Sequence, residues 1–284
     1  MMLRKIVFIF LISLVTSAKA QLLESFEHSG EMGLSIGLGH YFGDLNPDVN
    51  IKKPKFSAGA FFQKQFNNYV GMRISGNYAF LAYSDVSSNN VYQQRRNLSF
   101  NTNVWELSIS GYFNFFKFYP GFEEYSFTPY IHLGIGVFQY DPYAYLGGQK
   151  YYLRSLGTEG QGSALYPNLK PYSNIAMSIP LGFGIKKALN ERMNIFAEFS
   201  YRFTTTKYLD DVSGSYAPDA FSPVDANGNP SAWYLLQDRS YETGTSIGTK
   251  GKQRGNGQYD SFATLQVGVS FNIQSYRCPT PSGK

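Results

Sequence analysis

The chain has few of the residues that usually build disulfide frameworks or metal sites. Its 284 residues include one cysteine, Cys278, and three histidines, so an internal disulfide framework is excluded. No histidine has a metal-ligand spacing to another histidine, a cysteine or a carboxylate pair, and we expect neither a metal nor a cofactor. After residue 20 no apolar stretch is long enough for a membrane-spanning helix. If the chain enters a membrane, it must do so as β-strands.

Clustered charge of one sign is also missing. The chain has 25 Lys and Arg against 20 Asp and Glu, and three of the basic residues precede residue 21 without any acidic counterpart, which leaves a net charge of +2 for residues 21–284. The short run Lys52-Lys53-Pro54-Lys55 is interpreted as a solvated loop. Because recognition of nucleic acid needs a basic patch, no nucleic-acid partner is expected.

The first 20 residues have the pattern of a secretory signal peptide. A basic start is followed by an apolar run from Ile6 to Val15, which is too short to span a bilayer as a helix. Ala18-Lys19-Ala20 then has the small-x-small pattern of a cleavage site. We predict export, with a signal peptide over 1–20, a β-domain over 21–273 and a tail over 274–284.

Glycine, aromatic residues and alternating apolar residues are abundant instead. In the stretch 259–273, apolar residues from Ala263 to Ile273 alternate with Thr264, Gln266, Gly268, Ser270 and Asn272. This period of two predicts a strand with one apolar and one polar face. Eight segments share the pattern, near 31–42, 55–66, 69–81, 103–116, 128–140, 174–187, 193–205 and 259–273.

The connections between these segments alternate in length. Long ones lie near 43–54, 82–102, 141–173 and 206–258, and short ones at Asn67-Asn68, 117–127 and 188–192. This layout predicts an all-β fold, an eight-stranded antiparallel transmembrane up-and-down β-barrel with long extracellular loops and short periplasmic turns. Its location would be the outer membrane of a Gram-negative envelope, with the tail over 274–284 in the periplasm.

A secreted sandwich or a lipocalin-like barrel would also alternate, with its apolar face inward. The polar faces here are rich in Gly, Ser and Ala, which suits the crowded inside of a narrow barrel better than a hydrated exterior. Aromatic residues also gather near the strand ends, as in the girdles at membrane interfaces. These are Tyr41, Phe42, Phe80, Tyr83, Trp105, Phe115, Phe116, Tyr201 and Phe203. A lipid-facing apolar side is therefore favoured.

The predicted inward faces carry ionisable residues. An eight-stranded barrel is filled by side chains rather than open as a pore, and an inward charge is costly unless it is paired. Glu198 and Arg202 share one face four residues apart, so an internal charge and hydrogen-bond network is predicted, with a structural role and no diffusive transport. The inward ionisable residues are Arg73, Glu106, His132, Glu198 and Arg202.

Two features suggest other chemistry. His40, near the end of the first strand, is the candidate base for a lipid-modifying enzyme at the membrane rim, but no serine motif accompanies it. Asp210-Asp211 could bind a cation, although an exposed loop start is the favoured interpretation. We therefore do not expect an enzyme.

Several loop segments have distinctive sequences. They are LGTEGQG at 156–162, with Gly157, Thr158, Glu159 and Gly160, YLDDVS at 208–213, with Asp210 and Asp211, and KGKQRGN at 250–256. Together with GEMGLSIGLGHYFGDLN at 30–46 and the run at 182–216, they resemble the PorG-like outer-membrane barrel family of the Bacteroidetes type IX secretion and gliding-motility apparatus. The resemblance covers nearly the whole mature chain, and the first two segments carry most of its specificity.

The resemblance implies a non-catalytic integral barrel that associates with the periplasmic ring of the secretion machine. That ring consists of an outer-membrane lipoprotein and a soluble partner, and the protein-conducting channel is a different, larger barrel. Two alternatives stay open: a stand-alone barrel for adhesion or envelope stability, and a lipid-modifying enzyme. Cys278 would lie in the periplasm, either as a free thiol or in a disulfide to a ring component.

Overall fold

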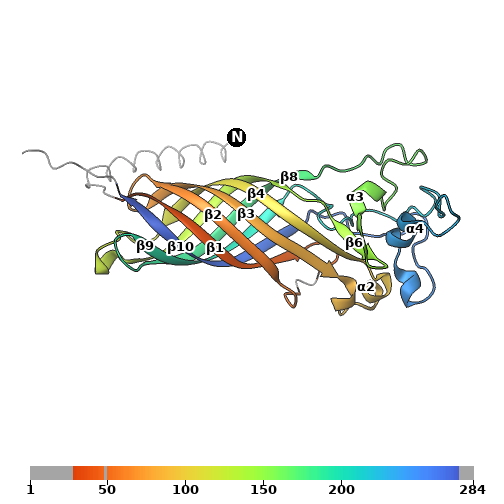
Figure 1. The fold of residues 1–284 in the computed structure, drawn as a ribbon, viewed down its shortest axis with the longest axis horizontal. Helices are drawn as coiled ribbons and strands as arrows, with labels where there is room; N and C mark the ends of the chain where they lie inside the picture. The colour runs from red at the N-terminus through yellow and green to blue at the C-terminus, as the bar shows by residue number, and fades with distance from the viewer. Residues whose placement is uncertain (1–27, 48–49, 275–284) are drawn as a thin grey trace, which may run out of the picture.

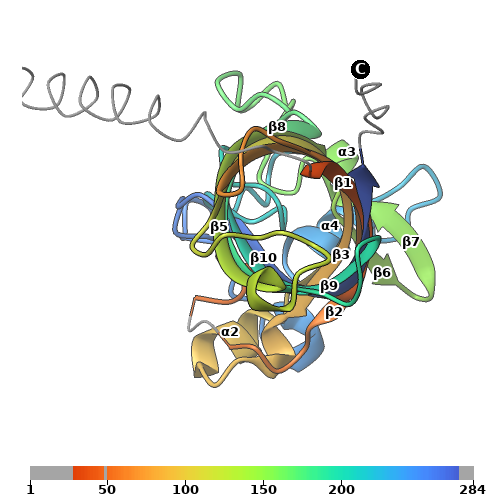
Figure 2. The same cartoon turned by 90° about the vertical axis from the view of Figure 1, so that its left-hand side faces the viewer.

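The computed structural model describes residues 28–47 and 50–274, in which eight antiparallel strands form a closed ring (Figures 1 and 2). Each strand pairs with its neighbours in the chain, and the last pairs with the first from Phe42–Ser261 to Glu31–Asn272. The predicted eight-stranded antiparallel barrel is thereby confirmed. Its strands are β1 (His28–Phe42), β2 (Lys55–Gln65), β3 (Val70–Ser84), β4 (Ser99–Asn114), β5 (Phe127–Gln139), β8 (Ile175–Ala188), β9 (Met193–Thr204) and β10 (Ser261–Gln274).

Most of the apolar side chains of the strands point outward. In β4, Trp105 and Leu107 are 62% and 63% exposed, whereas Glu106 between them is 4% exposed. The same alternation holds around the ring, so the outside of the barrel is a continuous belt of exposed aliphatic and aromatic residues. Soluble monomers rarely expose apolar patches of such extent. The barrel is therefore membrane-spanning, with its apolar face toward lipid and its polar face inward.

In the described ranges, no helix is both long enough and apolar enough to cross a bilayer.

Strands β3 and β4 run further than predicted, to Ser84 and from Ser99. Their extra residues project beyond the membrane because Tyr83 and Phe100 pack into an apolar cluster above the barrel. This corrects the predicted aromatic girdle. The side chains of Tyr41 and Tyr83 lie on the inward-facing side of their strands and are buried, whereas Trp105 lies on the outer surface.

The short connections close one end of the barrel. The β4–β5 connection contains the short 3₁₀ helix η2 (Glu123–Tyr125) and buries Phe118, which is 1% exposed. The Lys186 ammonium inside the barrel lies 4.4 Å from the centre of the Phe118 ring. An aromatic side chain thus covers the charged interior at the periplasmic end.

The four long connections fold together at the other end, on the right in Figure 1. We call residues 43–47, 50–54, 85–98, 140–174 and 205–260 the cap. The predicted long loops contain short elements, which are η1 (Asp85–Ser87), α2 (Val91–Arg96), β6 (Tyr143–Leu146), β7 (Gln149–Tyr152), α3 (Leu153–Leu156), α4 (Ala232–Gln237) and η3 (Ser240–Thr243). Its apolar core includes the buried Leu45, Leu98, Leu153, Leu209 and Leu236.

Local sequence explains the cap elements. The Asn90 side chain accepts the Tyr92 N–H at the start of α2, and Ser231 does the same for Tyr234 at the start of α4. Strands β6 and β7 are joined by Gly147-Gly148, both with positive φ (58° and 82°), as a tight hairpin turn requires.

Candidate functional site

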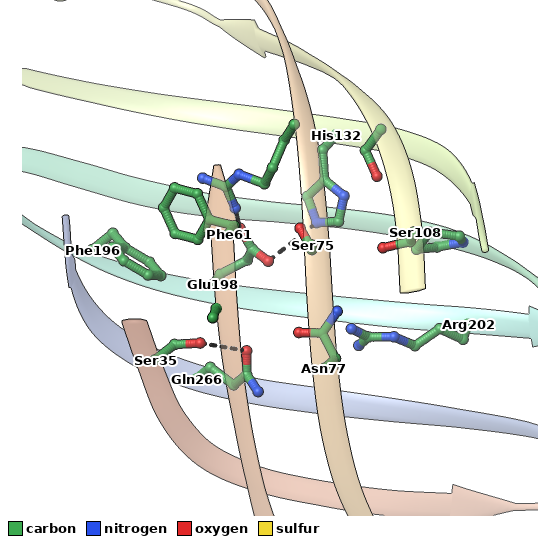
Figure 3. A pocket seen from close by; sticks show the side chains of 14 residues that line it. Ser35, Phe61, Ser75, Asn77, Ser108, His132, Phe196, Glu198, Arg202 and Gln266 are labelled. Carbon is green, nitrogen blue, oxygen red and sulfur yellow. Dashed lines mark hydrogen bonds and ion pairs between the residues drawn. The ribbon is translucent and has the colours of Figure 1, made fainter. Parts of the chain in front are cut away.

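The barrel lumen is a polar core. Its side chains leave a cavity of about 20 Å³, lined among others by Ser35, Asn77, His132 and Arg202 (Figure 3). Such a volume holds about one water molecule. The site is therefore built to hold charges in place rather than to contain a solute.

The central charge layer is organised around Glu198 of β9. Its carboxylate lies 2.8 Å from Nη1 of Arg73 and 3.4 Å from Nε2 of His132, and it accepts a 2.9 Å hydrogen bond from the Tyr130 hydroxyl. The Arg73 guanidinium also stacks 3.7 Å from the centre of the Phe61 ring. A buried charge is tolerable only with such partners, so this layer fixes four strands relative to one another.

A second layer lies nearer the cap. The Arg202 Nε is 3.2 Å from Oε2 of Glu106, and the Ser178 hydroxyl donates to Oε1 of the same carboxylate at 2.6 Å. Arg202 also donates through Nη1 to the Ser200 carbonyl at 3.0 Å. Both carboxylate oxygens and the guanidinium therefore have partners inside the barrel.

The third layer, at the periplasmic end, was missed by the sequence analysis. Lys186 Nζ lies 2.5 Å from Oε1 of Glu31, and Oε2 of Glu31 accepts from Ser270 at 2.6 Å and from Asn194 at 3.0 Å. The signal was present, because Glu31 precedes the apolar Met32 and Lys186 follows the inward Gly184. Both residues lie within the predicted strands near 31–42 and 174–187, and the alternation there places both inside.

All five sequence-predicted inward residues lie in the lumen: Arg73, Glu106, His132, Glu198 and Arg202. Glu198 and Arg202, although four residues apart on one face, do not pair with each other. Each pairs with a residue of a different strand, Arg73 and Glu106 respectively. The network therefore crosses the lumen instead of following one strand.

The cap has a polar core of its own, centred on Arg254. Its guanidinium lies 3.2 Å from Oε1 of Glu159 and 3.7 Å from Oδ2 of Asp211, and it donates to the Gln237 carbonyl at 3.1 Å. Glu159 in turn accepts the backbone N–H groups of Ser213 and Gly214, both at 2.9 Å. Two long loops are joined through this one side chain.

A second buried guanidinium links the other two loops. Arg96 at the end of α2 contacts Asp85 through Nε at 2.7 Å and through Nη2 at 2.8 Å. It also donates to the backbone carbonyls of Arg254 at 2.6 Å and Asp44 at 3.1 Å. The sequence analysis singled out the segment 250–256, which contains Arg254, but no local pattern marks Arg96 or Arg254 as buried.

The loop-motif residues occupy the centre of this cap. Gly157 and Gly160 have positive φ (65° and 89°), where a side chain would be strained. The Thr158 hydroxyl donates to Oδ2 of Asp211, and the Trp233 indole donates to the Gly157 carbonyl at 3.2 Å. These contacts connect the segment 156–162 to Asp211 and to α4 within the cap.

The favoured interpretation of Asp210-Asp211 as an exposed loop start is wrong. Both side chains are buried, at 1% and 0% exposure, because the chain folds back at Asp211 with φ 67°. Asp210 accepts the Tyr41 hydroxyl at 2.5 Å, and burial raises its pKa well above the ordinary value. Burial also raises the pKa of Asp211 to about 6, against the opposing effect of Arg254.

His40 is held by the first long loop. Its Nε2 donates to the Asn50 carbonyl at 2.7 Å, and the Asn46 side chain lies 3.2 Å away. Within the described residues, neither group recorded next to Nε2 is a nucleophile. Its geometry therefore gives no support to a general-base role.

Three predicted features lie outside the described residues. These are the cleavage motif at Ala18 and Ala20, the tail beyond Gln274, and Cys278.

Comparison with known proteins found solved structures of similar shape. Neisserial surface protein A is 10% identical, with 86% of this chain and 97% of that chain covered and a TM-score of 0.41. The outer membrane protein OprG of Pseudomonas aeruginosa is 8% identical, with 88% and 99% covered and a TM-score of 0.40. Ail of Yersinia pestis is 14% identical, with 86% and 99% covered and a TM-score of 0.37.

No match was found among curated proteins. One family model, whose description is Domain of unknown function (DUF6089), matches residues 3–248. Since this range is well over half of the 284 residues, the chain belongs to the DUF6089 family.

Proposed function

We propose that this protein is a non-catalytic outer-membrane barrel subunit that anchors or assists the periplasmic ring of a type IX secretion apparatus. The observation that carries the proposal is the meeting of three sequence segments, 156–162, 208–213 and 250–256, in one buried cluster. Glu159, Asp211 and Arg254 join them directly. These are the segments that resemble the PorG-like family, and their convergence supports a shared structural unit rather than three chance matches.

The lumen supports a structural role. Three carboxylates and three basic side chains form ion pairs between strands inside the barrel, where the cavity next to Arg73, Glu198 and Arg202 measures about 20 Å³. Passage of a solute would require these pairs to separate, and an unpaired buried charge costs several kcal/mol. The barrel therefore fits an accessory subunit better than a conduit.

The proposal places the ring contact at the end opposite the cap. The largest described connection there is the β4–β5 segment, which exposes Phe122, Glu123, Glu124 and Tyr125. An exposed aromatic side chain next to acidic residues suits a protein contact. The cap motifs would then support the fold of the barrel without touching the ring.

The test is affinity purification of the full chain from membranes of its own organism in mild detergent. A tag inserted in the exposed cap turn at Asp225–Asn229 keeps the periplasmic end free. We expect the ring lipoprotein and its soluble partner to co-purify. Their reproducible absence would refute the anchor and favour a stand-alone barrel for adhesion or envelope stability.

Two substitutions locate the contact. Phe122→Ala combined with Glu124→Lys should lower ring recovery several-fold, because both residues are exposed at the periplasmic end. Phe221→Ala, at a half-exposed cap position, is the matched control and should leave recovery unchanged.

A non-reducing gel of the purified samples shows whether Cys278 forms a disulfide to a ring component, since such an adduct must disappear in Cys278→Ser.

A further inference from the structure

The β6–β7 hairpin extends the lipid-facing surface of the barrel beyond the membrane. On β4, Trp105 faces outward, and Asn103 and Asn101 follow on the same face because strand side chains alternate. Asn101 pairs directly with Tyr143 of β6, so Tyr143 stands on the same face of the sheet, although its side chain is only 8% exposed. The hairpin therefore continues the outer wall of the barrel.

The outward face of the hairpin is aromatic and cationic. Tyr143 pairs with Tyr152 and Tyr145 with Lys150, which places all four side chains on one face. Tyr145 and Tyr152 are 51% and 45% exposed. The opposite face is held by the cap, where Ala144 is buried in the apolar core.

Lys150 lies between two aromatic rings. Its Nζ is 3.7 Å from the centre of the Tyr143 ring and 4.5 Å from that of Tyr152. Among the described residues, no carboxylate forms an ion pair with Lys150. The ammonium is therefore oriented by the tyrosines and keeps its capacity to bind an anion.

The position of this face relative to the membrane follows from the strand geometry. Trp105 and Tyr78, with ring centres 4.7 Å apart, form part of the aromatic girdle, and the outward residues beyond them on β4 are polar. Tyr143 lies level with Asn101, four residues past Trp105. At about 3.3 Å per residue and a tilt of about 40°, it is roughly 10 Å above the girdle. This is the depth of lipid headgroups rather than acyl chains.

We propose that the outward face of the β6–β7 hairpin binds the phosphorylated saccharide headgroup of an outer-leaflet glycolipid. Lys150 pairs with the phosphate, and the exposed faces of Tyr145 and Tyr152 pack against the apolar faces of the sugar rings. The site requires no contact with a secretion ring and stands independently of the proposed function.

The proposal is tested on the purified full chain in detergent micelles by native mass spectrometry. The probes are monophosphorylated lipid A, the same lipid after enzymatic removal of the phosphate, phosphatidylglycerol and inorganic phosphate. The wild type should bind the phosphorylated glycolipid about tenfold more tightly than its dephosphorylated form, as one charge-assisted contact allows. Phosphatidylglycerol and inorganic phosphate should bind more weakly than the phosphorylated glycolipid.

Variants identify the residue responsible. Lys150→Gln should abolish the preference for the phosphorylated form, and Lys150→Arg should keep it. Lys252→Gln is the matched control, because Lys252 Nζ lies 5.3 Å from the Tyr92 ring on α2, away from the hairpin; it should bind like the wild type.

Equal binding of both glycolipid forms by the wild type would overturn the proposal. It would also be overturned by an unchanged preference in Lys150→Gln, or by equal losses in Lys150→Gln and Lys252→Gln. Tighter binding of phosphatidylglycerol would assign the face to phospholipid instead. Heat-dependent gel mobility shows whether each variant is folded. If a variant fails to fold, the comparison of the two glycolipid forms on the wild type still tests the proposal.

Discussion

The lumen and the cap both bury charges, but they compensate them differently. In the lumen, three acidic side chains are matched one for one by three basic ones on other strands, in the pairs Glu31–Lys186, Glu198–Arg73 and Glu106–Arg202. Each pair also has hydroxyl or amide partners. Charge is balanced layer by layer along the barrel.

In the cap, buried acids outnumber buried bases. Two guanidiniums, Arg96 and Arg254, form ion pairs with Asp85, Glu159 and Asp211. The buried acidic residues of the cap are Asp44, Asp85, Glu159, Asp210, Asp211, Asp238 and Asp260. Most of these carboxylates are satisfied by backbone N–H groups or hydroxyls. Burial accordingly raises the pKa of Asp44 and of Asp211 to about 6.

The difference follows from the backbone. Strands pair their own N–H groups, so the carboxylates inside the barrel are met by other side chains. Loops leave backbone N–H groups free, and these stabilise carboxylates directly. A few arginines then suffice to hold a cap of irregular segments.

The largest effect is expected for Arg254→Ala. It leaves Glu159 and Asp211 buried without their cation. This should lower the free energy of cap opening by about 4 kcal/mol. Hydrogen exchange should show the cap amides losing protection while the strand amides keep theirs. Gln253→Ala, at the exposed neighbouring position, is the control. Equal protection in both variants would mean that Arg254 does not hold the cap.

A smaller effect is expected when the lumen pair Glu31–Lys186 is broken. Lys186→Met should lower the free energy of unfolding in lipid vesicles by about 3 kcal/mol, because Glu31 is left unpaired. The double variant Glu31→Leu, Lys186→Met should recover most of that loss. Lys187→Met, one residue along on the lipid face, should cost little. A double variant as unstable as the sum of its singles would contradict the pairing.

The smallest effect is a dependence of cap stability on pH. The pKa of Asp211 is raised from 3.8 to about 6 by burial, so its contribution is complete below pH 3.8 and is lost as the pH rises through 6. Between pH 4 and pH 7 the free energy of cap opening should fall by an amount on the order of 2 kcal/mol. Hydrogen exchange corrected for intrinsic rates measures this, and cap protection that increases over the same range would refute it.

Much of the barrel could be predicted from the sequence. Alternation placed Arg73, His132 and Glu198 on the inward face because side chains on a strand have only two directions. Their partners could not be predicted, since contacts across the lumen depend on how the closed ring staggers its strands. The hairpin was missed although Gly147-Gly148 between tyrosine-rich segments is a recognisable turn signal.

The cap could not be predicted in the same way. Arg254 lies in a polar segment with many exposed neighbours, and nothing local distinguishes it from Lys252 two residues before. Its burial depends on contacts with Glu159 and Asp211, 95 and 43 residues away. Such long-range contacts exist only once all four loops have been placed on the barrel rim.

The position of Glu31 also has a consequence for assembly. The barrel closes when its last strand joins its first, and Glu31 of β1 meets Ser270 of β10 at this seam. A slip of the seam by one residue would turn Glu31 from the lumen into hydrocarbon, and a slip of two would carry it away from Ser270. Of these alignments, only the correct one keeps the Glu31 carboxylate hydrogen-bonded inside the lumen. Glu31 therefore helps to specify the register in which the last strand pairs with the first.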